Sequence, residues 1–202
     1  MINKHNFISM KFKNISRTES KSILFVGNNL KNKYILYNNL IKMNKGFNIV
    51  IISPFEKYYN GLFGKNFVYN EFNDEIIKKI LFDGSNGLKT FVILDDIEIK
   101  KEYNNLMELL YNGRHYNIKF IANIKNKSIF NDGNTFTFDN ILLSTIDYNI
   151  ENIDLCKKYI GNIFDLSADE FIKQFGKTNI INICWGENKI YWFDVNNIQY
   201  TV

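Results

Sequence analysis

The sequence predicts an α/β fold with a mainly parallel, twisted sheet flanked by helices. Short apolar runs alternate with segments of helical periodicity along most of the 202 residues. The run Phe91–Leu94 is apolar throughout, as expected of a strand buried on both faces. Two segments with alternating polarity, Ile180–Trp185 and Lys189–Asp194, flank a glycine-bearing turn and predict a C-terminal β-hairpin.

The other elements follow from the same two patterns. Further core strands are predicted over Ser22–Val26, Phe47–Ile52, Phe120–Ile124 and Asn140–Ser144, with one more short strand considered over Phe7–Phe12. Helices are predicted over Lys33–Lys45, Asn73–Phe82, Glu102–Tyr111, Ile153–Phe164 and Ser167–Phe175. Asn73 suits a helix cap because two acids follow it in the first turn.

Length and composition indicate a single domain. A hydrophobic share of 46% supplies ample core for one α/β domain over residues 21–202, preceded by a polar N-terminal arm over residues 1–20. The net charge of +4 is compatible with a polyanionic partner but does not indicate one. Cys156 and Cys184 lack metal-ligand spacing, which favours reduced thiols in an intracellular protein. Neither a signal peptide nor a membrane-spanning stretch is predicted.

Two carboxylates, Asp95 and Asp96, follow directly on the apolar run Phe91–Leu94. Paired acids often only end a strand and cap the next helix. The alternative is a Walker B site, in which one carboxylate holds the water shell of Mg²⁺ and its neighbour orients or deprotonates the attacking water. This alternative predicts a phosphate-binding loop after an earlier strand.

The segment Gly27–Tyr34 lies between a predicted strand and a predicted helix, where such a loop belongs. In the pattern G-x-x-x-x-G-K-[ST], Gly27 and Lys33 are in register, whereas Asn32 replaces the second glycine and Tyr34 the hydroxyl residue. Asn tolerates left-handed backbone angles, so the loop shape can survive. The phenol of Tyr34 cannot place a small oxygen on Mg²⁺. A relic loop and a chance match both stay open on these residues.

A third segment adds a resemblance to a known family. Gly113-Arg114-His115-Tyr116-Asn117-Ile118 follows a leucine-bearing helix and leads into a strand. Together with Asp95–Asp96 and the I-I-S-P segment at Ile51–Pro54, it resembles the DNA-packaging ATPases of large nucleocytoplasmic DNA viruses. These form the poxvirus and giant-virus branch of the FtsK–HerA P-loop ATPases. The resemblance spans roughly residues 20 to 197, with a degenerate Walker A motif.

The resemblance implies a P-loop NTPase-like fold and specific roles for the residues that match. Lys33 would contact the β and γ phosphates, Asp95 would serve the Mg²⁺ shell, and Asp96 the attacking water. Arg114 would lie near a subunit interface or the γ-phosphate; the alternative for Arg114 and His115 is a loop stabilised by hydrogen bonds. The cofactors would be ATP and Mg²⁺, which we expect to bind weakly or not at all because of the substituted loop positions, Asn32 and Tyr34.

The implied function is ATP-dependent translocation of double-stranded viral DNA into a capsid. The implied partners are DNA, a homo-oligomeric ring or partner ATPase subunits, and capsid proteins, in the host cytoplasm (the viral factory) or the virion. Members of this family carry a glutamine at the end of the strand that follows the Gly113–Ile118 segment. It is missing here, and Asn123 or Lys125 would have to substitute for it. The family's R-x-N element is missing too, because residues 131–138 contain no arginine. Whether the chain is an enzyme therefore stays open. A catalytically inactive scaffold or ring subunit in virion assembly and a chance match of motifs are the alternatives.

Overall fold

The structure is a computed structural model, and it describes residues 7–9, 22–57, 59, 68–100, 102–125, 138–147, 173, 179–184 and 190–194. The predicted helices Ile153–Phe164 and Ser167–Phe175 lie outside these residues, Lys173 excepted. The chain divides into two compact units, each described by itself below. The boundaries expected for an N-terminal arm and a single domain stay predictions.

The unit that carries Asp95 is a parallel sheet with helices. Its strands lie in the order β6-β5-β3-β4, and each neighbouring pair is parallel. Their bounds are β3 Asn48–Ile52, β4 Val68–Tyr69, β5 Thr90–Ile97 and β6 Ile118–Ile124. Nearly every residue of β5 and β6 is buried, which explains why these strands read as unbroken apolar runs.

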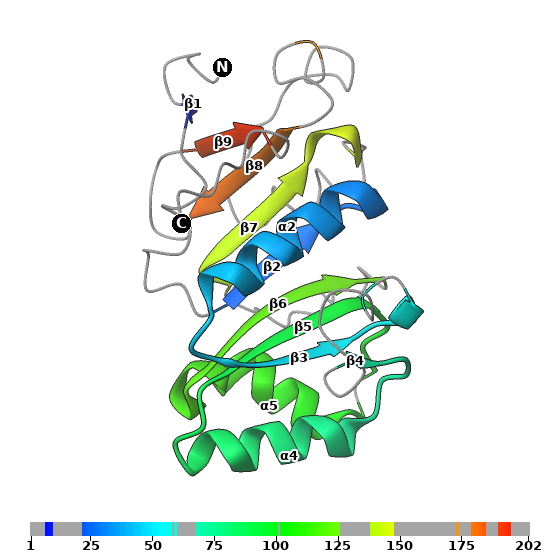
Figure 1. The fold of residues 1–202 in the computed structure, drawn as a ribbon, viewed down its shortest axis with the longest axis vertical. Coiled ribbons are helices and arrows are strands. Elements are labelled where there is room, and N and C mark those ends of the chain that lie inside the picture. Colours follow the sequence, from blue (N-terminus) through cyan, green and yellow to red (C-terminus); the bar gives the residue numbers. More distant parts are fainter. Residues whose placement is uncertain are drawn as a thin grey trace. The chain divides into compact units, whose positions relative to one another are not determined.

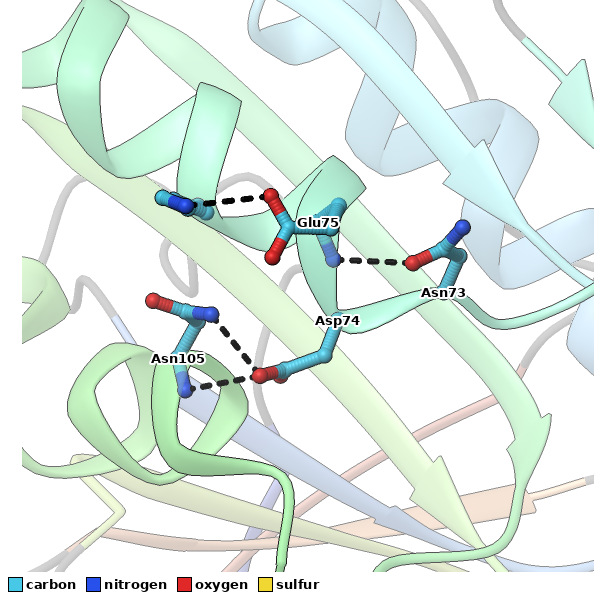
Figure 2. Close-up of polar contacts among 5 residues, drawn as sticks. Asn73, Asp74, Glu75 and Asn105 are labelled. Atoms are coloured by element: carbon cyan, nitrogen blue, oxygen red, sulfur yellow. Dashed lines mark hydrogen bonds and ion pairs between the residues drawn. The ribbon is translucent and has the colours of Figure 1, made fainter.

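Among the described residues, this unit also contains helices α4 Asp74–Ser85 and α5 Asn104–Asn112 and the 3₁₀ turn η3 Gly113–Tyr116. Helices α4 and α5 lie side by side (Figure 1). Asn73 caps α4 as predicted, since its side chain accepts a hydrogen bond from the Glu75 N–H at 2.9 Å (Figure 2). The helix extends past the predicted end at Phe82, and a Cβ at Gly84 would overlap the Tyr116 carbonyl oxygen. The glycine therefore lets α4 pack closely on η3.

The other unit carries the Gly27 loop. It contains β1 Phe7–Ser9, β2 Ser22–Val26 from Leu24 onward, α2 Leu30–Met43, β7 Asn140–Ser144, η5 Thr145–Asp147, β8 Asn179–Cys184 and β9 Ile190–Asp194. Its strands lie in the order β1-β9-β8-β7-β2. Strand β8 is antiparallel to both β7 and β9, and β1 is parallel to β9.

The α/β fold class and the C-terminal hairpin, β8–β9, are confirmed. One boundary differs in a way that bears on function: α2 begins at Leu30 rather than at Lys33. The Asn29 side chain accepts the Asn32 N–H at 3.0 Å, and the Asn29 carbonyl accepts the Lys33 N–H at 3.0 Å. Asn29 is thus the cap of a helix that already includes the last part of the expected loop. Within the described residues, no helix is long and apolar enough to cross a membrane.

Candidate functional site

The expected phosphate loop is reduced to three residues, Gly27 to Asn29, between β2 and α2. A Cβ at Gly27 would come within 2.8 Å of both the Ser144 Cβ and the Asp147 Oδ2. Any larger residue would force β7 or η5 to move. The glycine is therefore explained by packing within this unit, independently of any ligand.

Three backbone N–H groups in and just after this loop, those of Asn29, Asn32 and Lys33, have acceptors within the chain. The Asn29 N–H donates to the Asp147 Oδ2 at 3.2 Å. The N–H groups of Asn32 and Lys33 donate to the side chain and the carbonyl of Asn29, as described above. A phosphate-binding loop needs such N–H groups directed at the ligand. Here Asn29, Asn32 and Lys33 use theirs to begin a capped helix.

The side chains at three of the expected loop positions, Asn32, Lys33 and Tyr34, depart from a phosphate site as well. Asn32 lies in α2 and does not adopt the left-handed backbone that would have imitated a glycine. Its amide donates to the Ser144 Oγ at 3.4 Å, in a buried position. Lys33 is only 2% exposed, and Tyr34 is half-buried. The structure thus places Gly27 in the loop and Asn32, Lys33 and Tyr34 in the first turns of α2.

In the other unit, Asp95 is fully buried near the end of β5. Its Oδ2 accepts hydrogen bonds from the Ser53 Oγ and from the Tyr59 hydroxyl, both at 2.9 Å. Ser53 directly follows β3, the parallel neighbour of β5, so its position follows from the sheet order. A buried carboxylate needs donors of this kind. Asp95 is thus held in one orientation by two hydroxyl groups.

Asp96 occupies a β-bulge. The register of β5 and β6 shifts between Leu94 and Ile97, so that Asp95 and Asp96 lie opposite Asn123 alone. Asp96 has a left-handed backbone with φ 56°, which Asp tolerates better than most residues. Its carboxylate forms an ion pair with the Lys125 Nζ at 3.2 Å, with the two side chains 17% and 55% exposed. Asn123 and Lys125, the two predicted substitutes for the missing glutamine, thus both lie beside the acids.

The cluster that carried the family resemblance combines hydrogen-bonded side chains with exposed ones. The Glu108 carboxylate accepts the Asn112 amide at 3.0 Å and the Tyr116 hydroxyl at 2.8 Å. The hydrogen bond to Glu108, more than burial or the charge itself, raises the pKa of Tyr116 above its usual 10.0. Arg114 and His115 are exposed. Hydrogen bonds therefore account for Tyr116, whereas the alternatives for Arg114 and His115 stay predictions.

Arg114 does not lie beside Asp95 within its unit. It precedes Ile118, which pairs with Thr90 at the start of β5, whereas Asp95 is near the end of the same strand. At about 3.3 Å per residue, roughly 16 Å of strand separates Thr90 from Asp95. Of the two roles implied for Arg114, a place at a subunit interface is compatible with its exposure and stays a prediction.

Sequence reasoning missed three residues that contact the expected site: Ser53, Tyr59 and Asp147. A usable signal existed for Ser53 and Asp147, because each comes shortly after a predicted strand, where the ligands of open α/β sheets gather. Tyr59 lies in a segment with no periodic pattern. Nothing local in the sequence indicates which of these polar residues reaches Asp95 or the Gly27 loop.

In this structure the Gly27 loop and Asp95 each contact groups of their own unit and do not present theirs to ATP or Mg²⁺. The N–H groups of Asn29, Asn32 and Lys33 are bound internally. Asp147 lies against the loop, and Tyr34 offers no short hydroxyl oxygen. Asp95, the predicted metal residue, is buried and bonded to two hydroxyl groups. Across the described ranges, no group of three or more His, Cys, Asp or Glu side chains could hold a metal ion.

No family model and no curated protein matches this sequence. Solved structures do. The genome packaging NTPase B204 from Sulfolobus turreted icosahedral virus 2, in complex with ATP-gammaS, matches at 14% identity with a TM-score of 0.60, covering 87% of this chain and 97% of B204. B204 described as the DNA-packaging ATPase from Sulfolobus turreted icosahedral virus matches at 14% identity and a TM-score of 0.58, over 88% and 98%.

A more distant match extends the same fold. The pCW3 conjugation coupling protein TcpA, in a monomer form with ATPgS, matches at 8% identity and a TM-score of 0.54, over 87% of this chain and 60% of TcpA. At such identities the likeness concerns the fold. This chain therefore has the P-loop NTPase-like α/β fold of viral genome-packaging NTPases.

Proposed function

We propose that this chain is a subunit of a viral genome-packaging ATPase, acting in ATP-dependent translocation of double-stranded DNA into a capsid. The observation that carries the proposal is the likeness to B204, which extends over nearly the full length of both chains. The buried Asp95 and the adjacent Asp96 near the end of β5 add a feature that a chance fold match would not require.

The finer assignment rests on the resemblance of the Gly113–Ile118 segment to the poxvirus and giant-virus branch of the FtsK–HerA ATPases. In this proposal the chain works in a homo-oligomeric ring or with partner ATPase subunits, beside capsid proteins, in the viral factory of the host cytoplasm or in the virion. The exposure of Arg114 and His115 supports a place for them at a subunit contact. The net charge of +4 is compatible with DNA as a partner.

A second candidate is a catalytically inactive homologue that acts as a scaffold or ring subunit in virion assembly. The specific observation in its favour is the start of α2, where the N–H groups of Asn29, Asn32 and Lys33 donate hydrogen bonds within the chain. Tyr34 in place of a short hydroxyl residue points the same way. Both candidates share the fold and differ in whether nucleotide is hydrolysed.

The deciding experiment measures ATP hydrolysis by the full chain with Mg²⁺ and double-stranded DNA, alongside its oligomeric state. Lys33→Met and Asp96→Asn should abolish any turnover, whereas Lys31→Met, at an exposed position of the same helix, should keep it. The folding of each variant is checked by circular dichroism. Turnover with this pattern supports the ATPase.

Two other results separate the alternatives. A ring that binds DNA but neither binds nor hydrolyses ATP would select the scaffold candidate. A monomer with no affinity for DNA or nucleotide would contradict both candidates and leave only the fold.

A further inference from the structure

Asp147 is the unexpected residue at the Gly27 loop. It ends η5, the short turn that follows β7, and its Oδ2 lies 3.2 Å from the Asn29 nitrogen. The same oxygen lies 2.8 Å from the place where a Cβ at Gly27 would be. A carboxylate oxygen thus sits against the loop, bonded to a backbone N–H of the kind that a phosphate oxygen would use.

A second contact joins the same two segments. The Asn32 amide donates to the Ser144 Oγ at 3.4 Å, and Ser144 is fully buried as the last residue of β7. Both contacts connect residues more than 110 positions apart in the chain. The turn after β7 therefore holds the loop, and the end of β7 holds the first turn of α2.

Helix α2 also has an electrostatic reason to accept Asp147. Its first turn contains no acidic residue, whereas the first turn of α4 contains Asp74 and Glu75. The N-terminus of a helix carries a partial positive charge that a nearby anion stabilises. Asp147, from a distant part of the sequence, supplies a negative charge that the helix's own first turn lacks.

We infer that Asp147 sets the affinity of this loop for phosphate groups, because its carboxylate already accepts a loop N–H that a phosphate oxygen would otherwise bind. The inference deepens the proposed function, on which it rests for the nature of the ligand. Two anions cannot share the Asn29 N–H, and their charges repel each other at this distance. A nucleoside triphosphate or free phosphate binds only after the Asp147 side chain has left the loop.

The test compares the affinity of full-length wild-type protein and Asp147→Asn for inorganic phosphate by isothermal titration calorimetry. Asparagine keeps the size of the side chain and an oxygen for the Asn29 N–H, so the fold is retained while the charge is removed. Asp147→Ala serves as a second variant. Both should bind phosphate about tenfold or more tightly than the wild type, as expected when a charge-assisted contact no longer competes.

Asp139→Asn is the matched control, because Asp139 belongs to the same unit and precedes the other end of β7. It removes the same charge and should leave phosphate affinity unchanged. A gain of equal size in Asp139→Asn would overturn the inference in favour of a general charge effect. Unchanged or weaker phosphate binding in both Asp147 variants would overturn it as well.

Failure of the inference is distinguishable from failure of the proposed function. ATP hydrolysis by the wild type that Asp147→Asn leaves unchanged would overturn the inference and keep the ATPase. Tight phosphate binding by Asp147→Asn, without hydrolysis in any variant on double-stranded DNA, would support the inference and contradict the ATPase.

Discussion

At the N-termini of two helices, α2 and α5, a carboxylate from another segment of the chain accepts backbone N–H groups. At α5, Asp74 accepts the Asn105 N–H at 3.1 Å and the Asn105 amide at 2.8 Å (Figure 2). It also accepts the Leu106 N–H at 2.9 Å. At α2, Asp147 accepts the Asn29 N–H at 3.2 Å, the longest of these four bonds. The same chemical group thus caps two helices with different strength.

The difference separates a structural contact from one that a ligand can replace. Asp74 itself begins α4, so its carboxylate joins two neighbouring helices and satisfies backbone groups that would otherwise need water. The α2 cap relies on Asn29 for the N–H of Asn32, so Asp147 is an addition to a helix start that is already capped. A phosphate group could take the place of Asp147 without leaving α2 uncapped.

The largest effect is expected for Asp74→Ala. The substitution removes the acceptor of three hydrogen bonds and should lower the free energy of unfolding by about 2–4 kcal/mol. Urea denaturation followed by circular dichroism measures this loss. Glu75→Ala is the control: Glu75 forms an exposed ion pair with Lys78, worth about 0.5 kcal/mol or less. A loss below about 1 kcal/mol for Asp74→Ala would show that the α5 cap is not structural.

A smaller effect is expected for Asp147→Ala. The loss of one long hydrogen bond and of a favourable charge at the α2 N-terminus should cost about 1 kcal/mol in the same denaturation experiment. If instead Asp147→Ala destabilises the protein as much as Asp74→Ala, the two caps are equivalent. Asp147 would then be a fixed structural residue, and the contrast between the helices would be lost.

The smallest effect concerns Glu108, whose carboxylate accepts hydrogen bonds from side chains and not from backbone N–H groups. Its bond with the Tyr116 hydroxyl raises the pKa of the phenol, so the stability that this bond supplies is complete below the unfolded pKa of about 10. It is lost as the pH rises through the higher, folded-state pKa. The urea midpoint should therefore fall as the pH rises above about 10, and fall less in Tyr116→Phe. Glu108→Gln should show the same smaller decrease of the urea midpoint with pH as Tyr116→Phe. If the wild type and Tyr116→Phe show the same pH dependence, the Glu108–Tyr116 hydrogen bond does not contribute to it.

Much of the fold could be predicted because short sequence patterns, such as apolar runs and capping residues, determine the strands and the helix ends. The strands Ser22–Val26 and Asn140–Ser144 appear with the bounds expected from their apolar runs, and Asn73 caps its helix as its position suggests. Burial on both faces makes a strand apolar throughout, so such strands are easy to find. The predicted start of α2 was wrong by three residues, because Asn29 caps the helix at a position that the loop motif assigns to a phosphate loop.

The state of the candidate site could not be predicted in this way. The contact between Asn29 and Asp147 spans 118 positions, and no periodic pattern links residues so far apart. The bulge that gives Asp96 its left-handed backbone depends on the register of β6 against β5, which the sequence of β5 alone does not contain. Residue types at the motif positions predicted a weakened loop, and only the tertiary contacts show what lies against it.

Gly27 has a consequence for how related sequences are interpreted. The position tolerates no side chain because Ser144 and Asp147 lie against it, so selection for folding alone would keep a glycine there. A search that counts this glycine toward nucleotide binding would accept chains whose loop has never held a nucleotide. The position of Asp147, shortly after β7, is more informative. Related sequences without an acid there would have a loop whose N–H groups are not blocked by a carboxylate.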